Sequence, residues 1–522
     1  MFIEPNTNIR LLHNVPLDTT YKHTIYFANA TDQANYFIGM TKPNTNFVNQ
    51  SYQRVKKGVA RIGIKADSIY DCNYMMFKNT SFGDKWFYAF ITSVEYINNT
   101  VSEITFEIDV LQTWYFDYNL KECFVVREHS ETDEIGENIV AETVELGEYV
   151  YSDYSPLSFM RDLLVFIAVV DTKNEVVDGN VYDGVYSGTT LYVFNASDVA
   201  SINKKLAQYV EAPDSVVNVY TAPKFLAPAV ETGGAIMPYK ASGSSLIVSS
   251  TALAGTEDFD GFTPNNKKLY TYPYNYFHLD NASGNSLTLR YEFFDDLKPV
   301  IWIDGCISSP VKVVARPCSY KGMAKYNELG GYTALNNESI TLDGYPLCSW
   351  NTDTFKAWLA QNSVPMLGKA FTGVVGAMTS PAPSIGSAVG GVVGALTQGY
   401  SASIAADISK GNIASGNVNI SNGRQQFYKA RVHITNNYAR IIDEYFDTYG
   451  YATHRIKVPN IANKNAKKRP AWNYIETKDC VIVGSVPADD MKKICSIYNS
   501  GITFWMSGSG VGNYLQNNKP VA

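Results

Sequence analysis

The chain has 522 residues, of which 45% are hydrophobic, 13% aromatic and only 18% charged, a composition that excludes a largely disordered protein. Its aromatic content, with 37 tyrosines, favours pleated sheets and large interfaces. The formal net charge of −7 argues against a protein that grips phosphate backbones, because that function needs clustered lysine and arginine. Seven dispersed cysteines without C-x-x-C spacing are expected to be free thiols of a chain folded in a reducing compartment.

The first part of the chain, residues 1–150, is predicted to form a β domain whose strands are joined by tight loops. Residues 85–97 and 101–110 are expected to form a hairpin, since asparagine in the intervening turn tolerates positive φ. The second strand alternates apolar and polar residues, which is typical of a half-buried antiparallel strand. Its polar face is either ordinary solvent-facing surface or the lining of an aqueous channel, and it carries Glu103, Glu107 and Asp109.

The middle of the chain, residues 151–350, is predicted to form one or more further β-rich domains. Strand-like apolar runs at 163–170 and 190–197 alternate with loops rich in aspartate, asparagine and glycine. One helix is expected to follow the second run, at 198–210, because an N-cap residue precedes a helical pattern there.

The last part of the chain, residues 424–522, is predicted to be an α+β part that packs with the N-terminal domain. Its elements follow the order β-α-β-β-α-β, which is the pattern of a split βαβ fold. The first helix is expected to end at Gly450, because glycine is favoured just past a helix. Its buried stripe is predicted to hold Ile441, Ile442, Tyr445 and Tyr449. The predicted strands span 427–434, 455–458, 472–485 and 502–506, and the predicted helices span 437–450 and 487–501.

A central hydrophobic loop rich in glycine, alanine and serine is predicted at 351–423. No charged residue lies between Lys369 and Asp407, and the motif GVVGAMT at 373–379 recurs as GVVGALT at 391–397. Two prolines between the copies would break a helix, which favours two apolar arms joined by a tight turn. Glycines spaced four residues apart in the second arm would let helices approach closely in lipid.

The length and polarity of this segment leave two interpretations open. The first arm would make a helix of about 15 residues and about 22 Å, which is short of a bilayer core of about 30 Å. The second arm could just reach across, but its small residues make it weakly hydrophobic, so insertion by several copies together is more credible than by one. The segment is either a linker or small-residue hairpin, or a membrane-active loop. The residues of that loop would be Phe371, Gly373, Val374, Val375, Gly376, Met378, Pro381, Pro383, Ile385, Gly386, Val389, Gly390, Val392, Val393, Gly394 and Leu396.

Motifs of catalysis and metal binding are missing from the sequence. The six histidines never fall at the spacing of metal ligands, and no G-x-S-x-G, Walker or H-E-x-x-H motif occurs. The first residues lack the basic and apolar regions of a secretory signal, so none is expected. We therefore predict no enzymatic activity and no cofactor.

Sequence blocks near both ends of the chain carry a family resemblance, and they lie at 8–27, 71–79, 83–90, 106–117, 125–129, 449–460, 473–480 and 499–505. In these blocks the chain resembles the distal tail tube, or tail knob, protein of small short-tailed phages of Gram-positive bacteria. The resemblance implies a hexameric tube at the tail tip of the virion, assembled in the host cytoplasm with other tail proteins. DNA would pass through the tube during ejection without specific binding.

The resemblance also implies a fold and a role for the central loop. The fold would be a β-rich α+β structure of tail-tube-like β-barrel domains with flanking helices. In this family a hydrophobic loop between the matching blocks plugs the lumen and enters the host cytoplasmic membrane, and residues 351–423 occupy that place. The acidic face of 101–110 becomes a candidate lumen lining. The alternatives are a pore-forming protein that assembles only on membranes, and a receptor- or cell-wall-binding tail module.

Overall fold

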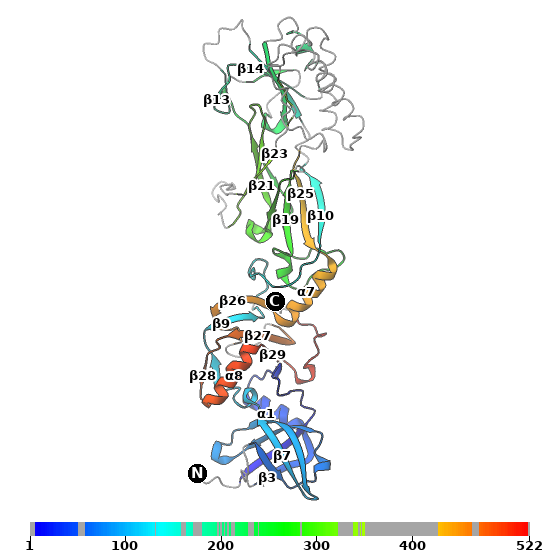
Figure 1. The fold of residues 1–522 in the computed structure, drawn as a ribbon, viewed down its shortest axis with the longest axis vertical. Coiled ribbons are helices and arrows are strands. Elements are labelled where there is room, and N and C mark those ends of the chain that lie inside the picture. The colour runs from blue at the N-terminus through cyan, green and yellow to red at the C-terminus, as the bar shows by residue number, and fades with distance from the viewer. Residues whose placement is uncertain are drawn as a thin grey trace, which may run out of the picture. The chain divides into compact units, whose positions relative to one another are not determined.

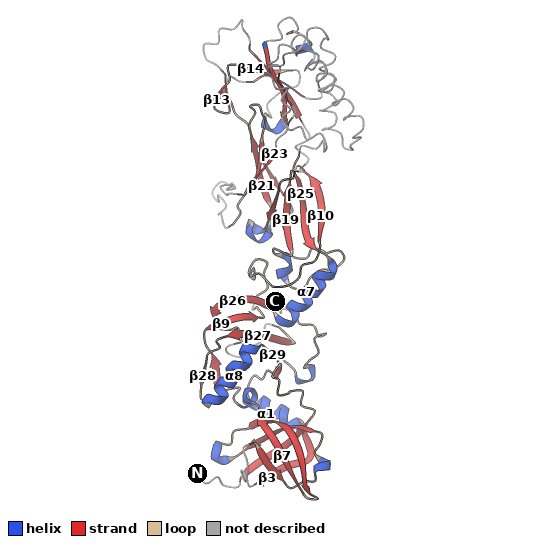
Figure 2. Ribbon diagram, viewed as in Figure 1, coloured by secondary structure: helices blue, strands red, loops and turns tan. Residues whose placement is uncertain are grey.

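The structure is a computed structural model with two compact units, each described by itself (Figure 1). Unit 1 consists of Met1–Leu146, Asp258–Leu269 and Asn436–Ala522, and unit 2 consists of Gly147–Glu257 and Tyr270–Thr435. The described residues are 6–50, 58–130, 132–157, 163–170, 180–195, 215–227, 234–237, 240–281, 284–321, 338–342, 347–349, 426–461 and 469–519, with Tyr345 and a few residues between 198 and 209. The fold is β-rich α+β, with several mainly antiparallel sheets and few helices (Figure 2).

Six strands of unit 1 form an antiparallel sheet that curves into a half-barrel, in the order β3-β1-β5-β6-β7-β4. The predicted hairpin is confirmed, since β6 and β7 pair with Asn98 opposite Val101 across the turn. The strands are β1 (Thr7–His13), β3 (Thr41–Gln50), β4 (Val59–Ile62), β5 (Cys72–Lys78), β6 (Phe87–Asn98) and β7 (Val101–Ile108).

Both faces of this sheet are apolar along its middle strands, because alternate side chains point to opposite sides. Met75 of β5 and Ala89 of β6 belong to one buried cluster, together with Ile104 of β7. Tyr74 and Phe90, their neighbours in the chain, belong to a second cluster that also contains residues of the C-terminal part such as Ile475 and Ile494. The N-terminal sheet and the C-terminal part therefore share one hydrophobic core.

The second sheet of unit 1 combines strands from both ends of the chain, in the order β2-β29-β27-β9-β26. Trp472 of β27 lies opposite Trp505 of β29, with ring centroids 5.2 Å apart, and both side chains are fully buried. Helices α1 (Ala30–Gly39), α2 (Val110–Thr113), α7 (Asn436–Tyr449) and α8 (Ala488–Ser500) complete the unit. The strands are β2 (His23–Ile25), β9 (Cys123–Glu128), β26 (Tyr451–Lys457), β27 (Trp472–Lys478) and β29 (Ile502–Trp505), and a separate pair joins β8 (Tyr118–Leu120) to β28 (Ile482–Gly484).

This pairing corrects the split βαβ prediction for the C-terminal part. The first predicted strand is β25 (Tyr428–Ile434), which pairs with strands of unit 2, while β26, β27 and β29 pair with β2 and β9 from the N-terminal part. The predicted long strand at 472–485 is also wrong, because it divides into β27 and β28 where Asp479 takes a positive φ of 57°.

The two predicted C-terminal helices are confirmed as α7 and α8, each followed by a glycine with positive φ. A side chain at Gly450 would meet the backbone carbonyl oxygen of Glu128 at 2.3 Å, so only glycine fits at this close approach. The predicted stripe of α7 is wrong in part, because Ile441 and Tyr449 are exposed. The helix instead buries Ala439, Ile442, Asp443 and Phe446.

The buried Asp443 of α7 is paired with a segment that lies far away in the sequence. Its carboxylate accepts hydrogen bonds from the backbone amides of Asn265 and Asn266, each at 3.0 Å. The side-chain amide of Asn266 donates to Asp443 and to Asp447, each at 2.9 Å. Its oxygen accepts from Tyr451 and Arg469, each at 3.1 Å, so the fully buried Asn266 has both ends of its amide satisfied.

A second buried polar group lies beside this asparagine. The Glu142 carboxylate is fully buried and forms ion pairs with Arg127 and Lys268. It also accepts a hydrogen bond from the amide of Ala452 at 2.8 Å. A buried charge is tolerated only when it is paired and hydrogen-bonded, and both conditions hold here.

The neighbouring His129 is held in its neutral form. Its Nδ1 accepts a hydrogen bond from the amide of Tyr474 at 2.7 Å, and its Nε2 donates to the carbonyl oxygen of Asp447 at 3.1 Å. Burial lowers the pKa of His129 to about 3, and the nearby Arg469 and Arg127 add to this effect. The ring therefore joins β9, β27 and α7 as an uncharged donor and acceptor.

The described residues of unit 2 form four sheets. The predicted strands at 163–170 and 190–197 are confirmed as β11 and β14, and every described residue of β11 is buried. The sheet orders are β10-β25-β19-β20, β16-β14-β11-β15-β24, β13-β12-β17 and β18-β21-β22-β23. The remaining strands are β10 (Tyr149–Pro156), β11 (Leu163–Val169), β12 (Val181–Tyr182), β13 (Val185–Tyr186), β14 (Thr190–Asn195), β15 (Val216–Pro223), β16 (Ala235–Ile236), β17 (Lys240–Ala241), β18 (Leu246–Ser249), β19 (Asn275–Asp280), β20 (Ser286–Leu289), β21 (Val300–Gly305), β22 (Val313–Pro317), β23 (Ile340–Leu342) and β24 (Leu347–Ser349).

Replacement of Asn266 by alanine tests the buried network of unit 1. The variant removes an acceptor that Tyr451 and Arg469 share and the side-chain amide that donates to Asp443 and Asp447, so we expect a loss of about 2–4 kcal/mol in the free energy of unfolding. Urea titration followed by tryptophan fluorescence measures this loss. The matched control, Asn119→Ala at an exposed position of β8, should change stability by less than about 0.5 kcal/mol. Equal losses in both variants would contradict the importance of the network.

Candidate functional site

The exposed face of β7 forms a polar strip with its two neighbouring strands. Glu103 lies opposite Glu95 of β6 on one side and opposite Arg61 of β4 on the other. Arg61 Nε donates to the Glu103 carboxylate at 2.8 Å. Because like charges directly opposite one another are destabilising, this ion pair offsets the repulsion between Glu95 and Glu103.

Glu107 lies four residues after Glu103 on β7 and therefore on the same face of the strand. Its carboxylate forms an ion pair with Lys493 of α8, and its side chain is 47% exposed. An ion pair this exposed contributes little to stability, about 0–1 kcal/mol. The strip of Glu95, Glu103, Glu107, Arg61 and Lys493 therefore has three carboxylates and two cations. We call these five residues the polar strip.

Asp109 does not share this face, so the prediction that it lies beside Glu103 and Glu107 on an exposed surface is wrong. β7 ends at Ile108, and Asp109 caps the short helix α2 by accepting from the amides of Leu111 and Gln112, each at 3.1 Å. The hydroxyl of Tyr74 donates to its other oxygen at 2.8 Å. Asp109 is buried, and this burial raises its pKa to about 6.

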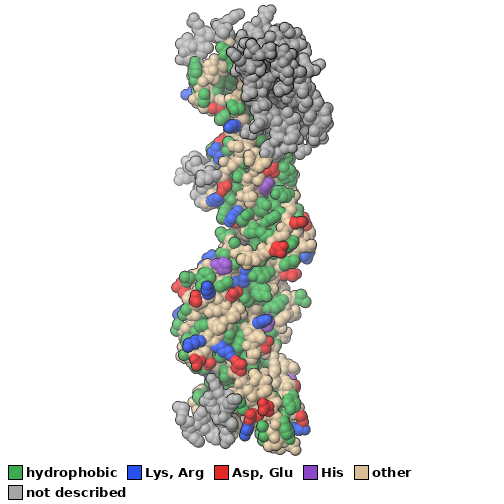
Figure 3. All heavy atoms as spheres, viewed as in Figure 1, with side chains coloured by type: hydrophobic (Ala, Val, Ile, Leu, Met, Phe, Trp, Pro, Cys, Tyr) green, Lys and Arg blue, Asp and Glu red, His purple; other side chains and the backbone are tan. Residues whose placement is uncertain are grey.

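The partners of the two exposed glutamates could not be found from the sequence. Arg61 lies on a strand 42 residues away from Glu103, and Lys493 lies 386 residues away from Glu107. No local sequence pattern indicates either ion pair, because sheet order and helix packing bring the two partners together. Figure 3 shows acidic and basic side chains interspersed on the face drawn, without a large field of one sign.

The other predicted site residues, the loop positions from Phe371 to Leu396, lie outside the described residues. Within the part of the chain that the structure describes, no helix has both the length and the apolar character needed to cross a bilayer. The described residues also contain no group of three histidine, cysteine or carboxylate side chains arranged to hold a metal ion.

The protonation of Asp109 gives a prediction for pH dependence. The folded state holds this proton more tightly than the unfolded chain, whose aspartate has a pKa of about 3.9, so the contribution to stability is complete below about pH 4 and is lost as the pH rises through about 6. Asp109→Asn keeps the cap without the charge. We therefore expect the difference in free energy of unfolding, measured by urea titration, to shift in favour of the variant by about 2–3 kcal/mol between pH 4 and pH 7.

Asp109→Ala is the comparison for this measurement. It removes the acceptor used by Tyr74 and two backbone amides, and should be less stable than Asp109→Asn by about 1–3 kcal/mol at both pH values. A difference between wild type and Asp109→Asn that stays constant from pH 4 to pH 7 would contradict a proton held in the core.

Two family models match the chain. The model of the Bacillus phage phi29 tail knob protein gp9, C-terminal domain, matches residues 239–519, which is more than half of the 522 residues. The model of the Caudoviral major tail protein N-terminus matches residues 5–119, which include the half-barrel strands. Together they cover parts of both units.

Individual phage proteins are similar along their whole length. The tail knob protein gp9 of Bacillus phage B103 is 25% identical, and that of Bacillus phage phi29 is 24% identical, with 98% of each chain covered. The structure of the bacteriophage C1 tail knob protein gp12 superposes with a TM-score of 0.62 over 99% of this chain, at 13% identity, which shows a shared fold. The resemblance found in the sequence blocks is thereby confirmed, and the chain belongs to the phi29 gp9 family of phage tail knob proteins, which are structural components of the virion tail and not enzymes.

Proposed function

We propose that this tail knob protein assembles as a hexamer into the distal tube of the tail, through which genomic DNA leaves the virion. Hydrophobic loops formed by residues 351–423 plug this tube and leave it to penetrate the host cytoplasmic membrane. The observation that carries the proposal is the uncharged segment between Lys369 and Asp407, which lies inside a chain that matches its tail knob relatives over 98% of its length.

The charge pattern supports a passage that does not retain DNA. Proteins that hold DNA need clustered lysine and arginine, whereas this chain has a net charge of −7. In the polar strip, Arg61 and Lys493 are each paired with a carboxylate, so neither cation is available to a phosphate without a cost. We place Glu103 and Glu107 on the lumen wall, where carboxylates repel the DNA backbone.

The repeated, glycine-spaced arms of the central segment support a loop that acts in several copies. A single copy is weakly hydrophobic, so its insertion into lipid is marginal. A hexamer would deliver the arms together, which raises their effective concentration at one point of the membrane. The glycines at 386, 390 and 394 would then allow close packing between arms in the bilayer.

Deletion of the central segment tests its membrane role. We expect the purified full chain to release dye from liposomes, and a variant in which residues 366–416 are replaced by a short Gly/Ser linker to lose this release. The reason is that the deletion removes the uncharged apolar arms and leaves the tube-forming parts intact. Negative-stain electron micrographs should show sixfold rings for both proteins without lipid.

Two other outcomes of this experiment would contradict the proposal. Equal dye release by the deletion variant would exclude the loop as the membrane-active part. Rings that form only when lipid is present would favour the alternative of a pore-forming protein that assembles on membranes.

Neutralising the polar strip tests the lumen assignment. Glu103→Gln with Glu107→Gln removes the carboxylates that form ion pairs with Arg61 and Lys493, so assembled rings should retain linear DNA at low salt and release it as the salt concentration rises. Fluorescence anisotropy of labelled DNA measures this binding. The control, Glu122→Gln with Glu145→Gln, removes the same charge from other exposed positions and should bind no more than wild type. Equal DNA binding by the two double variants would contradict a lumen position for the strip.

A further inference from the structure

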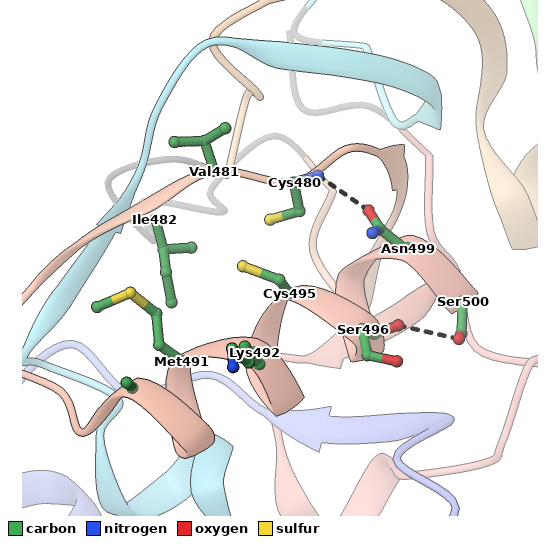
Figure 4. Close-up of a pocket in the computed structure, with 10 residues that line it drawn as sticks. Cys480, Val481, Ile482, Met491, Lys492, Cys495, Ser496, Asn499 and Ser500 are labelled. Atoms are coloured by element: carbon green, nitrogen blue, oxygen red, sulfur yellow. Dashed lines mark hydrogen bonds between the residues drawn. The ribbon is translucent and has the colours of Figure 1, made fainter.

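Two cysteines of unit 1 face each other beside a surface pocket. Cys480 follows β27, and Cys495 lies in the middle of α8. Figure 4 shows their sulfur atoms turned toward one another in the space between the segment at 480–482 and the helix. The two thiols are close enough for a hydrogen bond between them.

The pocket gives small molecules access to both sulfur atoms. Its volume is about 630 Å³, which lies within the range of small-ligand sites. Both cysteines are half-buried and line it, together with apolar side chains of the strand and the helix such as Ile482 and Met491. Lys492, three residues before Cys495 on α8, also lines the pocket and brings a positive charge to this helical face.

The backbone of Cys480 is fixed against α8 by hydrogen bonds to one side chain. The Oδ1 atom of Asn499 accepts from the amide of Cys480 at 3.1 Å and from the hydroxyl of Thr477 at 2.9 Å. Asn499 lies one helical turn after Cys495, so the same part of α8 carries one cysteine and positions the other. The approach of the two thiols is therefore set by the fold, through the contact between Asn499 and the segment that carries Cys480.

We propose that Cys480 and Cys495 form a reversible intramolecular disulfide when the virion meets low-molecular-weight disulfides outside a reducing cytoplasm. The thiolate of Cys495 attacks one sulfur of the reagent, forms a mixed disulfide and releases the first small thiol. Cys480 then attacks the protein sulfur of this mixed disulfide and releases the second. Two electrons pass from the cysteine pair to the reagent, and the two thiol protons end on the released thiols.

The order of these two steps follows from the surroundings of each thiol. Burial raises the pKa of Cys480, and the adjacent Cys495 adds to this effect, so Cys480 is the poorer first nucleophile. Lys492 lies on the same helical face as Cys495 and brings a positive charge to the pocket that both thiols line. Cys123 lies close enough to influence both thiols electrostatically, but it is buried, so the small reagent cannot reach it directly.

The product would link the end of β27 to α8 and close the chain between them into a loop. Such a link limits the freedom of the unfolded chain, so the oxidised protein should resist unfolding better than the reduced one. The tail would thus be strengthened only after release, when its thiols leave the reducing environment in which the chain folds.

The test uses the full chain, purified in its reduced form and treated with oxidised glutathione. Unreacted thiols are then alkylated, and tryptic peptides are identified by mass spectrometry without reduction. Cys480 and Cys495 fall in different peptides, 479–492 and 494–522, so a disulfide joins two otherwise separate masses. We expect this linked pair in at least half of the molecules, and its loss on treatment with dithiothreitol. Retention of both peptides in alkylated or singly glutathionylated form would overturn the proposal.

Three cysteine variants distinguish a disulfide between two positioned thiols from general oxidation of accessible thiols. In Cys480→Ala, Cys495 should stop at the mixed disulfide and gain one glutathione, while Cys495→Ala should leave Cys480 largely unmodified. In Cys306→Ala, which removes an exposed thiol of unit 2, the linked pair should form as in wild type. The midpoint of thermal unfolding should rise on oxidation in the wild type and in Cys306→Ala. It should not rise in Cys480→Ala or Cys495→Ala. Linking of Cys480 or Cys495 to any other cysteine at comparable yield would also overturn the proposal.

Discussion

The folding of unit 1 depends on a buried polar network that joins three distant parts of the chain. The side-chain amide of Asn266 forms hydrogen bonds with residues of α7 and β26 and with Arg469. These bonds connect the segment Asp258–Leu269 to the C-terminal part. Glu142 attaches the same segment to β9 through Lys268 and Arg127. A buried polar group that loses one partner carries the full cost of desolvation, so the members of this network stabilise the fold only together.

With these segments held in place, the two sheets of unit 1 can share one core. Tyr74 and Phe90 on the N-terminal sheet pack into the same cluster as Ile475 and Ile494 from the C-terminal part. The polar strip results from the same packing, because α8 brings Lys493 beside Glu107. The strip, the paired thiols and the cap at Asp109 therefore all depend on how α8 and α2 lie against the half-barrel.

The tail knob family to which the chain belongs is structural and not enzymatic. Its function lies in surfaces and in assembly, for which mixed surface charge, extensive sheets and abundant tyrosine are suited. The proposed conduit must bind DNA only weakly, because a wall that binds the phosphate backbone would slow the passage of the DNA. The proposed disulfide adds a covalent link that does not interfere with folding in a reducing compartment.

The amino-acid sequence alone predicts the β-rich class, the hairpin of β6 and β7, the strands β11 and β14 and the two C-terminal helices. Each has a local signal, which is alternation, an apolar run or a terminal glycine. The blocks of the sequence also identified the family. Long-range packing determines that Asp109 is a buried cap, that Asp443 and not Ile441 faces the core, and that β25 pairs outside the C-terminal sheet. These outcomes depend on partners such as Tyr74 and Asn266, which are brought near by sheet order and helix packing, and local periodicity contains no information about such distant pairs.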